Sequence, residues 1–249
     1  MSGTRFDDLA DVYEAMIDWP KRLANEEPFY RRWFCGAGVR RLLDVACGTG
    51  RHAAMFHSWG LRVEAADISP RIIERARAAL GELEGLSWAV RGFDQPVAAE
   101  EPFDAALCVG NSLALAPDWP TVRRAVAAMF AAVRDGGLVI LHILNLWRLP
   151  DGPCLWQKCT CATLQQGDAL ILKGVHRSGS RGYVDLVVTS LAGVPQMQSE
   201  SVPFLGIEAS DLLALARAAG ASETHLFGSY QEQTYQRETS VDLILAARK

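Results

Sequence analysis

The run 42–53, which reads Leu-Leu-Asp-Val-Ala-Cys-Gly-Thr-Gly-Arg-His-Ala, constrains the fold of this chain more than any other segment. A short apolar run that ends in two closely spaced glycines predicts a buried strand, a tight turn and then a helix. Glycine lets the backbone bend sharply and approach a ligand without interference from a Cβ atom. In open α/β sheets, ligands bind beyond the carboxyl end of such a strand. We therefore expect a doubly wound α/β sheet with a ligand site at Gly48 and Gly50.

The rest of the chain alternates strand-like and helix-like segments, as a parallel sheet with crossover helices requires. The predicted sheet strands lie at 41–46, 62–68, 86–90, 104–109 and 138–144, with two further strands at 224–230 and 241–247. Between residues 146 and 205 the pattern contains no good helix, and it predicts instead strands at 169–176 and 183–191 joined by a hairpin at 179–182. A helix capped by Ser210 and ending at Gly220 then follows.

This pattern divides the chain into three parts. We expect an N-terminal helical lid over 1–36, a ligand-binding domain over 37–145 and 206–249, and a β-rich insertion over 146–205. The chain of 249 residues, 49% of them hydrophobic, is large enough for this arrangement.

Charge and cysteine content limit the classes of partner that we expect. The net charge is −4 and lysine and arginine form no run, which argues against a nucleic-acid partner because phosphate neutralisation supplies most of that affinity. The polar N-terminus and the lack of an apolar stretch of about 20 residues predict neither a signal peptide nor a membrane partner. Six cysteines then indicate a reduced, cytoplasmic protein. The spacing of Cys154, Cys159 and Cys161 matches no standard zinc pattern, so we expect no metal.

The glycine turn alone leaves the ligand open. Gly48, Gly50 and Ala53 also fit the dinucleotide fingerprint, and Asp67 after the next strand suits the ribose of any adenine nucleoside or the cap of the following helix. Asp44, four residues before the first glycine, separates the possibilities. A carboxylate there opposes a pyrophosphate but suits the sulfonium and ammonium groups of S-adenosylmethionine. We therefore predict S-adenosylmethionine as the cofactor, with a nicotinamide-dependent oxidoreductase as the alternative.

These residues resemble a known family. The segment 42–53 is similar to motif I of class I S-adenosylmethionine-dependent methyltransferases, and Asp67 occupies the place of that family's ribose-binding acid. The segments 6–22 and 107–113 resemble the lid and the fourth strand of the glycine/sarcosine N-methyltransferase-like group, and 135–138 resembles the family's Pro-Gly-Gly turn with Asp in place of Pro. The likeness covers 6–144 and resumes in the last helix and two strands.

The resemblance implies a seven-stranded, mostly parallel sheet whose last strand is reversed. It also assigns cofactor-binding positions in the lid, the glycine turn and the ends of the second, third and fourth strands; with Asp44 and His52 added, these are Tyr13, Trp19, Arg22, Asp44, Ala46, Gly48, Gly50, His52, Asp67, Ile68, Phe93, Asp94, Val109, Asn111 and Leu113. Structural alternatives stay open at several of them. Tyr13 and Trp19 also suit core aromatics, Arg22 a solvated charge and Asn111 a helix cap.

Methyl transfer is an in-line displacement, so the protein mainly aligns the reactants and excludes water. A base is needed only if the acceptor arrives protonated, and His142 and Tyr13 are the candidates, although a strand histidine is often structural. Candidate acceptor-binding residues follow the fourth and fifth strands or lie in the insertion: Asn111, Asn145, Trp156, His176 and Arg177. The sequence thus predicts transfer to a nitrogen or oxygen of a small molecule by a monomer or homodimer. A non-catalytic scaffold and a protein or RNA methyltransferase are the remaining alternatives.

Overall fold

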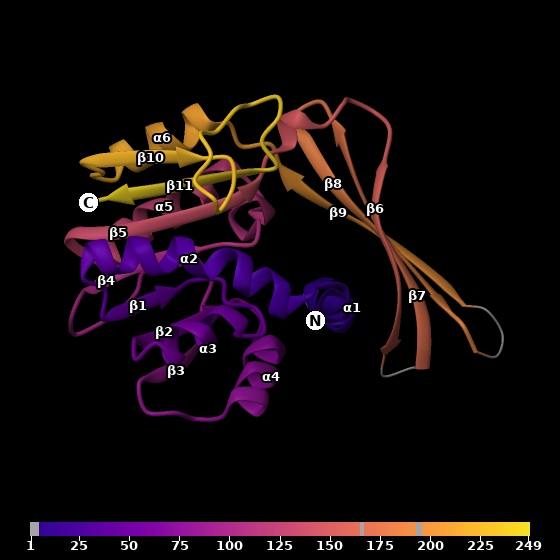
Figure 1. Cartoon of the computed structure of the whole chain (residues 1–249), viewed down its shortest axis with the longest axis horizontal. Coiled ribbons are helices and arrows are strands. Elements are labelled where there is room, and N and C mark those ends of the chain that lie inside the picture. The colour runs from indigo at the N-terminus through magenta and orange to yellow at the C-terminus, as the bar shows by residue number, and fades with distance from the viewer. Residues whose placement is uncertain (1–4, 165–166, 193–195) are drawn as a thin grey trace.

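The computed structural model describes residues 5–164, 167–192 and 196–249, and it contains two separate β-sheets (Figure 1). The first has seven strands in the order β10-β11-β5-β4-β1-β2-β3, and the second has four strands in the order β6-β7-β8-β9. The strands are β1 (Arg41–Asp44), β2 (Arg62–Asp67), β3 (Leu86–Val90), β4 (Phe103–Cys108), β5 (Val133–Leu144), β6 (Leu155–Leu164), β7 (Gly167–Ser178), β8 (Arg181–Ser190), β9 (Met197–Leu205), β10 (Glu223–Phe227) and β11 (Asp242–Arg248). The helices are α1 (Arg5–Met16), α2 (Trp19–Ala37), α3 (Arg51–Ser58), α4 (Pro70–Leu80), α5 (Trp119–Ala132) and α6 (Ala209–Ala218), with short 3₁₀ turns at Ser112–Leu115 and Leu146–Arg148.

The pairing of the seven-stranded sheet confirms the predicted fold class. β1 pairs in parallel with β2 and β4, β2 with β3, and β4 with β5. β11 is antiparallel to both β5 and β10, which makes it the reversed strand. The second sheet is antiparallel throughout and lies between β5 and α6 in the chain, as an insertion.

Helices cover both faces of the large sheet. Apolar side chains of α2, α3 and α4 pack with Leu42 and Leu138 on one face. Those of α5 and α6 pack with Leu43 and Val139 on the other. Because neighbouring residues of a strand point to opposite faces, strands buried on both sides carry continuous apolar runs. This is why the sequence shows them clearly.

The helix starts also follow local sequence rules. Asp18, Ser69 and Asp118 each accept a hydrogen bond from a backbone N–H three residues later, and a proline occupies one of the first two helical positions after each. The last helix differs from the prediction, since Glu208 rather than Ser210 is the cap. Glu208 and Asp211 form a reciprocal capping box there.

Two strands of the small sheet, β6 and β9, were not predicted. Both are edge strands with many exposed residues, and polar side chains interrupt their apolar pattern. Likewise, β5 begins at Val133 and runs through Asp135-Gly136-Gly137, where the sequence predicts a turn before the strand.

Helix α1 lies between the two sheets (Figure 1). Val12 and Met16 pack against Ile171 and Leu186 of the small sheet. Asp11 on the opposite side of the helix forms an ion pair with Arg75 of α4. The helix therefore connects the small sheet to the helical layer of the large one. Among the described residues, none of the helices combines the length and apolarity needed to cross a bilayer.

Candidate active site

The glycine turn lies between β1 and α3, as predicted. Gly48 and Gly50 have φ angles of 54° and 81°, in the left-handed region that favours glycine. At Gly50 a Cβ atom would lie 2.5 Å from Trp88 Cη2, so packing also excludes a side chain. At Gly48 a Cβ atom would meet nothing within 4 Å. The turn therefore leaves free space beside its backbone, on the side where a ligand would approach.

The two predicted carboxylates meet at this edge of the sheet. Asp67, at the end of β2, accepts hydrogen bonds from the backbone N–H groups of Gly48 (3.1 Å) and Ser69 (3.0 Å). It thus ties the glycine turn to the start of α4. Asp44 ends the neighbouring strand β1, and the charge of Asp67 acts on it.

Asp44 is the most unusual group in the site. Its side chain is 1% exposed, and within the described part of the chain neither carboxylate oxygen forms a hydrogen bond of normal geometry. Burial raises the pKa of Asp44 to about 7; the nearby Ala46 N–H opposes this rise, and Asp67 adds to it. A buried carboxylate without a partner is costly, and a positively charged ligand would remove that cost. The site therefore fits a cationic ligand.

A second part of the site lies at the ends of β2 and β3. Ile68 is 62% exposed, an unusual position for a large apolar side chain beside a glycine turn. A Cβ atom at Gly92 would lie 3.2 Å from Asp94 Oδ1 and 3.7 Å from Ile68 Cδ1, so Ile68 and Asp94 flank the same backbone. Asp94 is also paired with Arg124 of α5 at 2.8 Å, and Phe93 packs partly buried against the core. An exposed apolar surface next to a carboxylate suits a flat base with an amino group.

Helix α1 is attached directly to the glycine turn. Glu14 accepts hydrogen bonds from the Thr49 hydroxyl and, at 2.9 Å, from Arg51 Nη2. Tyr13 beside it is 43% exposed. The predicted lid residue Tyr13 therefore lies on a helix that is anchored at the site. No pattern in the sequence singles out Glu14, which anchors it.

Beneath the lid, a buried polar network centres on Glu26 of α2, which is 2% exposed. Arg22 Nε donates to Glu26 at 2.8 Å, and His52 Nε2 lies 2.7 Å from its other oxygen. Burial alone would raise the pKa of Glu26, but His52 and Arg22 lower it to about 2. Burial lowers the pKa of His52. The network is therefore an ionised Glu26–Arg22 pair with a neutral His52 that donates to Glu26.

This network positions Arg22 at the end of β4. The guanidinium lies 5.1 Å from the Trp19 ring centroid, and a Cβ atom at Gly110 would be 3.4 Å from Arg22 Nη2. Trp19 Nε1 is buried without a hydrogen-bond partner in the described structure. The structure thus brings Trp19 and Arg22 to the same edge as the glycine turn, while His52 supports Arg22 through Glu26.

His142 has both ring nitrogens engaged. Gly110 N–H donates to Nδ1 at 3.1 Å, which places the proton of the neutral ring on Nε2, and Nε2 lies 3.1 Å from an Asp242 oxygen. The side chain joins the ends of β4, β5 and β11 and is 6% exposed. This geometry leaves no free lone pair, so it gives no support to the predicted role of His142 as a base.

Asn111 has a structural contact of the same kind. It adopts a left-handed conformation with φ of 73°, and its Oδ1 accepts from Leu144 N at 3.0 Å. Val109 and Leu113 on either side are 4% and 0% exposed and belong to the core. The predicted cofactor-binding role of these three residues stays a prediction.

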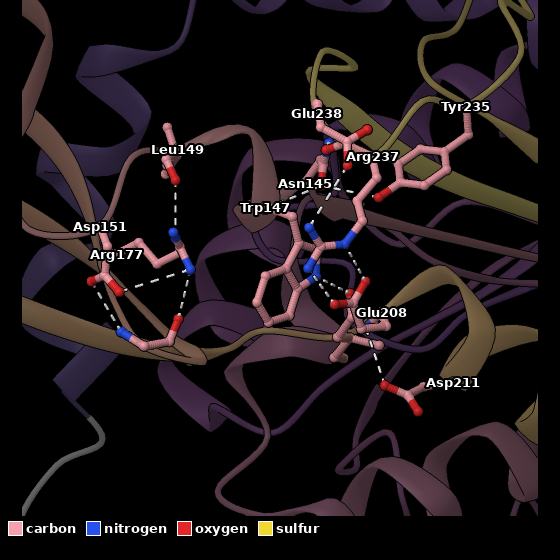
Figure 2. Close-up of polar contacts among 12 residues, drawn as sticks. Asn145, Trp147, Leu149, Asp151, Arg177, Glu208, Asp211, Tyr235, Arg237 and Glu238 are labelled. Atoms are coloured by element: carbon pink, nitrogen blue, oxygen red, sulfur yellow. Dashed lines mark hydrogen bonds and ion pairs between the residues drawn. The ribbon is translucent and has the colours of Figure 1, made fainter.

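Two predicted acceptor-binding residues lie instead at the base of the insertion (Figure 2). Asn145 donates to the carbonyls of Arg237 and Ser240, both at 2.8 Å, and accepts from Trp147 N and the Tyr235 hydroxyl. Arg177 Nε donates to the carbonyl of Leu149 at 2.9 Å, and its Nη1 donates to that of Gly179.

In the same region, Arg237 pairs with Glu208 and stacks over Trp147, with 4.6 Å to the ring centroid. The contacts of Trp147 with Arg237 and with the Ile207 carbonyl join the insertion to the large domain. We call the cluster around Trp147 the root of the insertion: Asn145, Trp147, Arg177, Glu208, Tyr235 and Arg237. The polar groups of Asn145 and Arg177 are used there, so the geometry gives no support to an acceptor-binding role for either.

Trp156 and His176 lie on the face of the small sheet that points away from α1. Ile171 and Leu186 contact α1 and therefore mark the face of the small sheet that points toward α1. Because side chains alternate along β7, His176 lies on the face away from α1. Trp156 is 57% exposed. Neither residue is near the glycine turn, so their predicted acceptor-binding role also gains no support.

Several residues of the site escaped sequence reasoning. Glu26 follows Arg22 by one helical turn, which is a usable signal for an ion pair but not for burial. Tyr30, whose hydroxyl lies 3.1 Å from that of Tyr230, and Asp242 join the network across long sequence separations. No local pattern marks such contacts.

Comparison with known proteins agrees with this geometry. Residues 42–137 match the family model described as a methyltransferase domain. The chain is 33% identical over 152 residues to a glycine/sarcosine N-methyltransferase of Parasynechococcus marenigrum, covering 59% of this chain and 52% of that protein. It is 32% identical over 154 residues to the glycine N-methyltransferase of Homo sapiens, covering 52% of each chain. The chain thus spans about half the length of the curated relatives it matches.

Solved structures match over nearly the whole chain. A methyltransferase from Streptomyces caelestis has a TM-score of 0.76 at 18% identity, covering 99% of this chain and 98% of that one. A sugar N-methyltransferase from Streptoalloteichus has a TM-score of 0.75 at 22% identity, covering 100% and 94%. At these identities the likeness establishes the fold alone. Residues 42–137 therefore match a methyltransferase domain, and the chain as a whole has the fold of these solved methyltransferase structures.

Proposed function

We propose that this chain binds S-adenosylmethionine at the carboxyl edge of β1 and β2 and transfers its methyl group to a nitrogen of a small molecule. The observation that carries the proposal is Asp44, a buried carboxylate without a hydrogen-bond partner in the described structure, beside a glycine turn. The names of the relatives, which act on glycine and sarcosine, and of a sugar N-methyltransferase of the same fold favour nitrogen over oxygen.

Different residues of the site would bind different parts of the cofactor. Asp67 would accept from the ribose hydroxyls, and Ile68 and Asp94 would contact the adenine. Arg22, held by Glu26 at the end of β4, would pair with the carboxylate of the methionyl part. Asp44 would supply negative potential at the glycine turn toward the cationic part.

When bound, the sulfonium cofactor supplies an activated methyl group and its leaving group. The chain then has to align the acceptor and exclude water. Helix α1, attached to Thr49 and Arg51 on one side and to the small sheet on the other, closes the site from above. A neutral amine acceptor needs no base, and Tyr13 remains the candidate for an acceptor that arrives protonated.

The acceptor would approach beside α1, along the part of the inner face of the small sheet that carries Lys173. Lys173 of β7 lies on that face with Ile171, and in the described structure it forms no ion pair. Burial lowers the pKa of Lys173, and the nearby positive charges of Arg22 and Lys158 lower it further. Lys173 and Lys158 thus add two cations beside the Arg22–Glu26 ion pair, and this excess of positive charge favours an acceptor that carries an anionic group beside its amine. In this arrangement 1–36 form the lid, 37–145 and 206–249 bind the cofactor, and 146–205 form one wall of the acceptor site.

Calorimetric titration of the full chain tests the cofactor assignment. We expect one equivalent of S-adenosylmethionine and of S-adenosylhomocysteine to bind, and NADH not to bind. Asp67→Ala should weaken both by about 2 kcal/mol or more, because two hydrogen bonds to a charged group are lost. Asp135→Asn, at a fully exposed aspartate, is the matched control. Binding of NADH alone, or of none of the three, would contradict the proposal.

A second measurement isolates Asp44. Asp44→Asn should weaken the sulfonium-bearing cofactor more than S-adenosylhomocysteine, whose thioether is neutral. Because the pKa of free Asp44 is raised to about 7, cofactor binding should release a proton at pH 6 and almost none at pH 9. Titrations in buffers of different ionisation enthalpy report this release. Methyl transfer itself is then measured with labelled cofactor on a panel of amines with and without an acidic group.

A further inference from the structure

Three potential metal ligands converge on the outer face of the small sheet, away from the glycine turn. Cys154 lies just before β6, His176 is on β7 and Asp185 is on β8. Asp185 Oδ2 lies 2.5 Å from His176 Nδ1 and 3.4 Å from Cys154 Sγ. All three ligand atoms lie within 4.8 Å of one another.

The neighbouring residues hold these side chains in place. Gly174 pairs with Asp185 across the sheet, and a Cβ atom there would lie 2.4 Å from Cys154 Sγ. The thiol therefore occupies the space that a side chain at position 174 would fill. The His176 ring stacks on Tyr183, with centroids 4.7 Å apart and planes 8° apart, and Ser201 hydrogen-bonds to Asp185. Contacts of this kind orient the first ligands of metal sites.

The order of the three groups argues against a nucleophilic cysteine. In a catalytic triad the histidine stands between the nucleophile and the acid. Here the same Asp185 oxygen lies between Cys154 and His176, so the imidazole does not contact the thiol. The arrangement instead directs one sulfur, one nitrogen and one oxygen toward a common point.

We propose that Cys154, His176 and Asp185 bind a divalent transition-metal ion, with Zn²⁺ the ion best suited to this donor set. Zinc takes thiolate, imidazole and carboxylate ligands at about 2.0–2.3 Å in tetrahedral geometry, which places neighbouring ligand atoms roughly 3.3–3.6 Å apart. The Cys154–Asp185 separation of 3.4 Å already matches this spacing. His176 Nδ1 and Asp185 Oδ2 have to move apart, and they would do so as their hydrogen bond is replaced by one bond from each atom to the ion.

Such an ion would join the segment before β6 to β7 and β8. It would therefore clamp the small sheet close to the root of the insertion, and it would take no part in methyl transfer on the opposite face. The sequence-based expectation of no metal considered the spacing of Cys154, Cys159 and Cys161. The proposed partners of Cys154 come instead from two later strands, β7 and β8. Cys159 and Cys161 lie farther along β6, where they are opposite Leu172 and Leu170 of β7.

Metal titration of the full chain, first stripped with a chelator, tests this site. We expect one equivalent of Co²⁺ to bind with a thiolate charge-transfer absorption band that Zn²⁺ abolishes. Cys154→Ser should remove the band and weaken Zn²⁺ binding at least about tenfold, since even outer-shell changes cost that much. Cys161→Ser, at an exposed cysteine of β6, should leave both unchanged. A band that persists in Cys154→Ser, or its absence from the wild type, overturns the proposal.

A second measurement needs no variant. Bound Zn²⁺ should protect Cys154 from alkylation, while the exposed Cys35, Cys159 and Cys161 react at the same rate with and without the ion. Peptide mass mapping after a short pulse of reagent reads out each cysteine separately. Equal alkylation of Cys154 in both conditions would show that the ion does not bind there.

Discussion

The seven-stranded sheet has helices on both faces, whereas the small sheet has α1 on one face and exposes much of the other. Along β5, Leu138, Ile140 and Leu141 have no exposed surface. On the outer side of the small sheet, Trp156 and Met197 are 57% and 72% exposed. The first sheet is therefore stabilised by close packing of its core. The second depends on its attachment to other elements, through α1 and the root of the insertion.

This difference in packing matches a difference in proposed function, since the large sheet carries the cofactor site and the small sheet borders the acceptor. The packed sheet fixes the strand ends at which Asp44, Asp67 and Gly110 lie, and a binding site needs such rigid support. The small sheet lies apart from these strand ends and is joined to them through α1 and the root of the insertion. We infer that one fold can keep the cofactor site constant and vary the acceptor side.

The largest expected effect tests the packing difference directly. Leu141→Ala in β5 should lower the free energy of unfolding by about 3 kcal/mol, the loss typical of a buried leucine. Leu172→Ala on the outer face of β7, where the side chain is only half-buried, should cost under about 1 kcal/mol. Urea unfolding of the two variants measures both. Equal losses would mean that the small sheet is covered in solution by something other than α1.

Acid stability should depend on the network under the large sheet. Glu26 has a pKa of about 2 in the folded chain against an ordinary value of 4.5. A depressed carboxyl pKa contributes stability that is present above pH 4.5 and is lost as the pH falls toward 2. The full contribution is about 3 kcal/mol, taking roughly 1.4 kcal/mol for each unit of pKa.

Glu26→Gln should therefore flatten the decline in unfolding free energy between pH 4.5 and pH 2, while lowering stability at neutral pH. Glu27→Gln, at the more exposed neighbour on the same helix, is the control and should keep the decline. An unchanged decline in Glu26→Gln would show that another carboxyl group causes it.

The root of the insertion should give a smaller, local effect. Asn145→Ala leaves two carbonyls, the Trp147 N–H and the Tyr235 hydroxyl without their partner, which should cost about 2 kcal/mol. Asn25→Ala, whose partner Gln231 is exposed, should cost almost nothing. Thermal unfolding measures the loss, and faster amide exchange in β6–β9 should accompany it. A loss confined to the large sheet would contradict the role of Asn145 as an attachment point.

The same difference explains what sequence reasoning could reach. Buried strands with continuous apolar runs, the glycine turn and the Asp-Pro or Ser-Pro helix starts are local patterns, so the large sheet and the positions of Asp44 and Asp67 were predictable. The edge strands β6 and β9 carry mixed residues that satisfy no strong pattern. Contacts such as Glu26–His52 and His142–Asp242 join distant segments and depend on the finished fold. For the same reason sequence reasoning could assign Asn145 and Arg177 to an acceptor but could not foresee the hydrogen bonds that both side chains make at the root of the insertion.

The smallest expected effect concerns α1, the element shared by the two sheets. Glu14→Gln weakens a partly exposed ion pair with Arg51, and such pairs contribute under about 1 kcal/mol to stability. Global unfolding should therefore barely change. The helix, however, is held at the glycine turn mainly by Glu14 and at α4 by Asp11, so losing one of these contacts should raise its local opening. Amide exchange of residues 11–16 should become several times faster in Glu14→Gln, while β5 stays unchanged.

Glu74→Gln, at an exposed glutamate of α4, is the matched control and should leave the exchange of α1 as it is. If α1 also kept its protection in Glu14→Gln, its apolar contact with Ile171 and Leu186 would be the stronger attachment. The helix would then move with the small sheet rather than with the glycine turn. Opening of the site would in that case separate α1 from Thr49 and Arg51 and leave the acceptor wall intact.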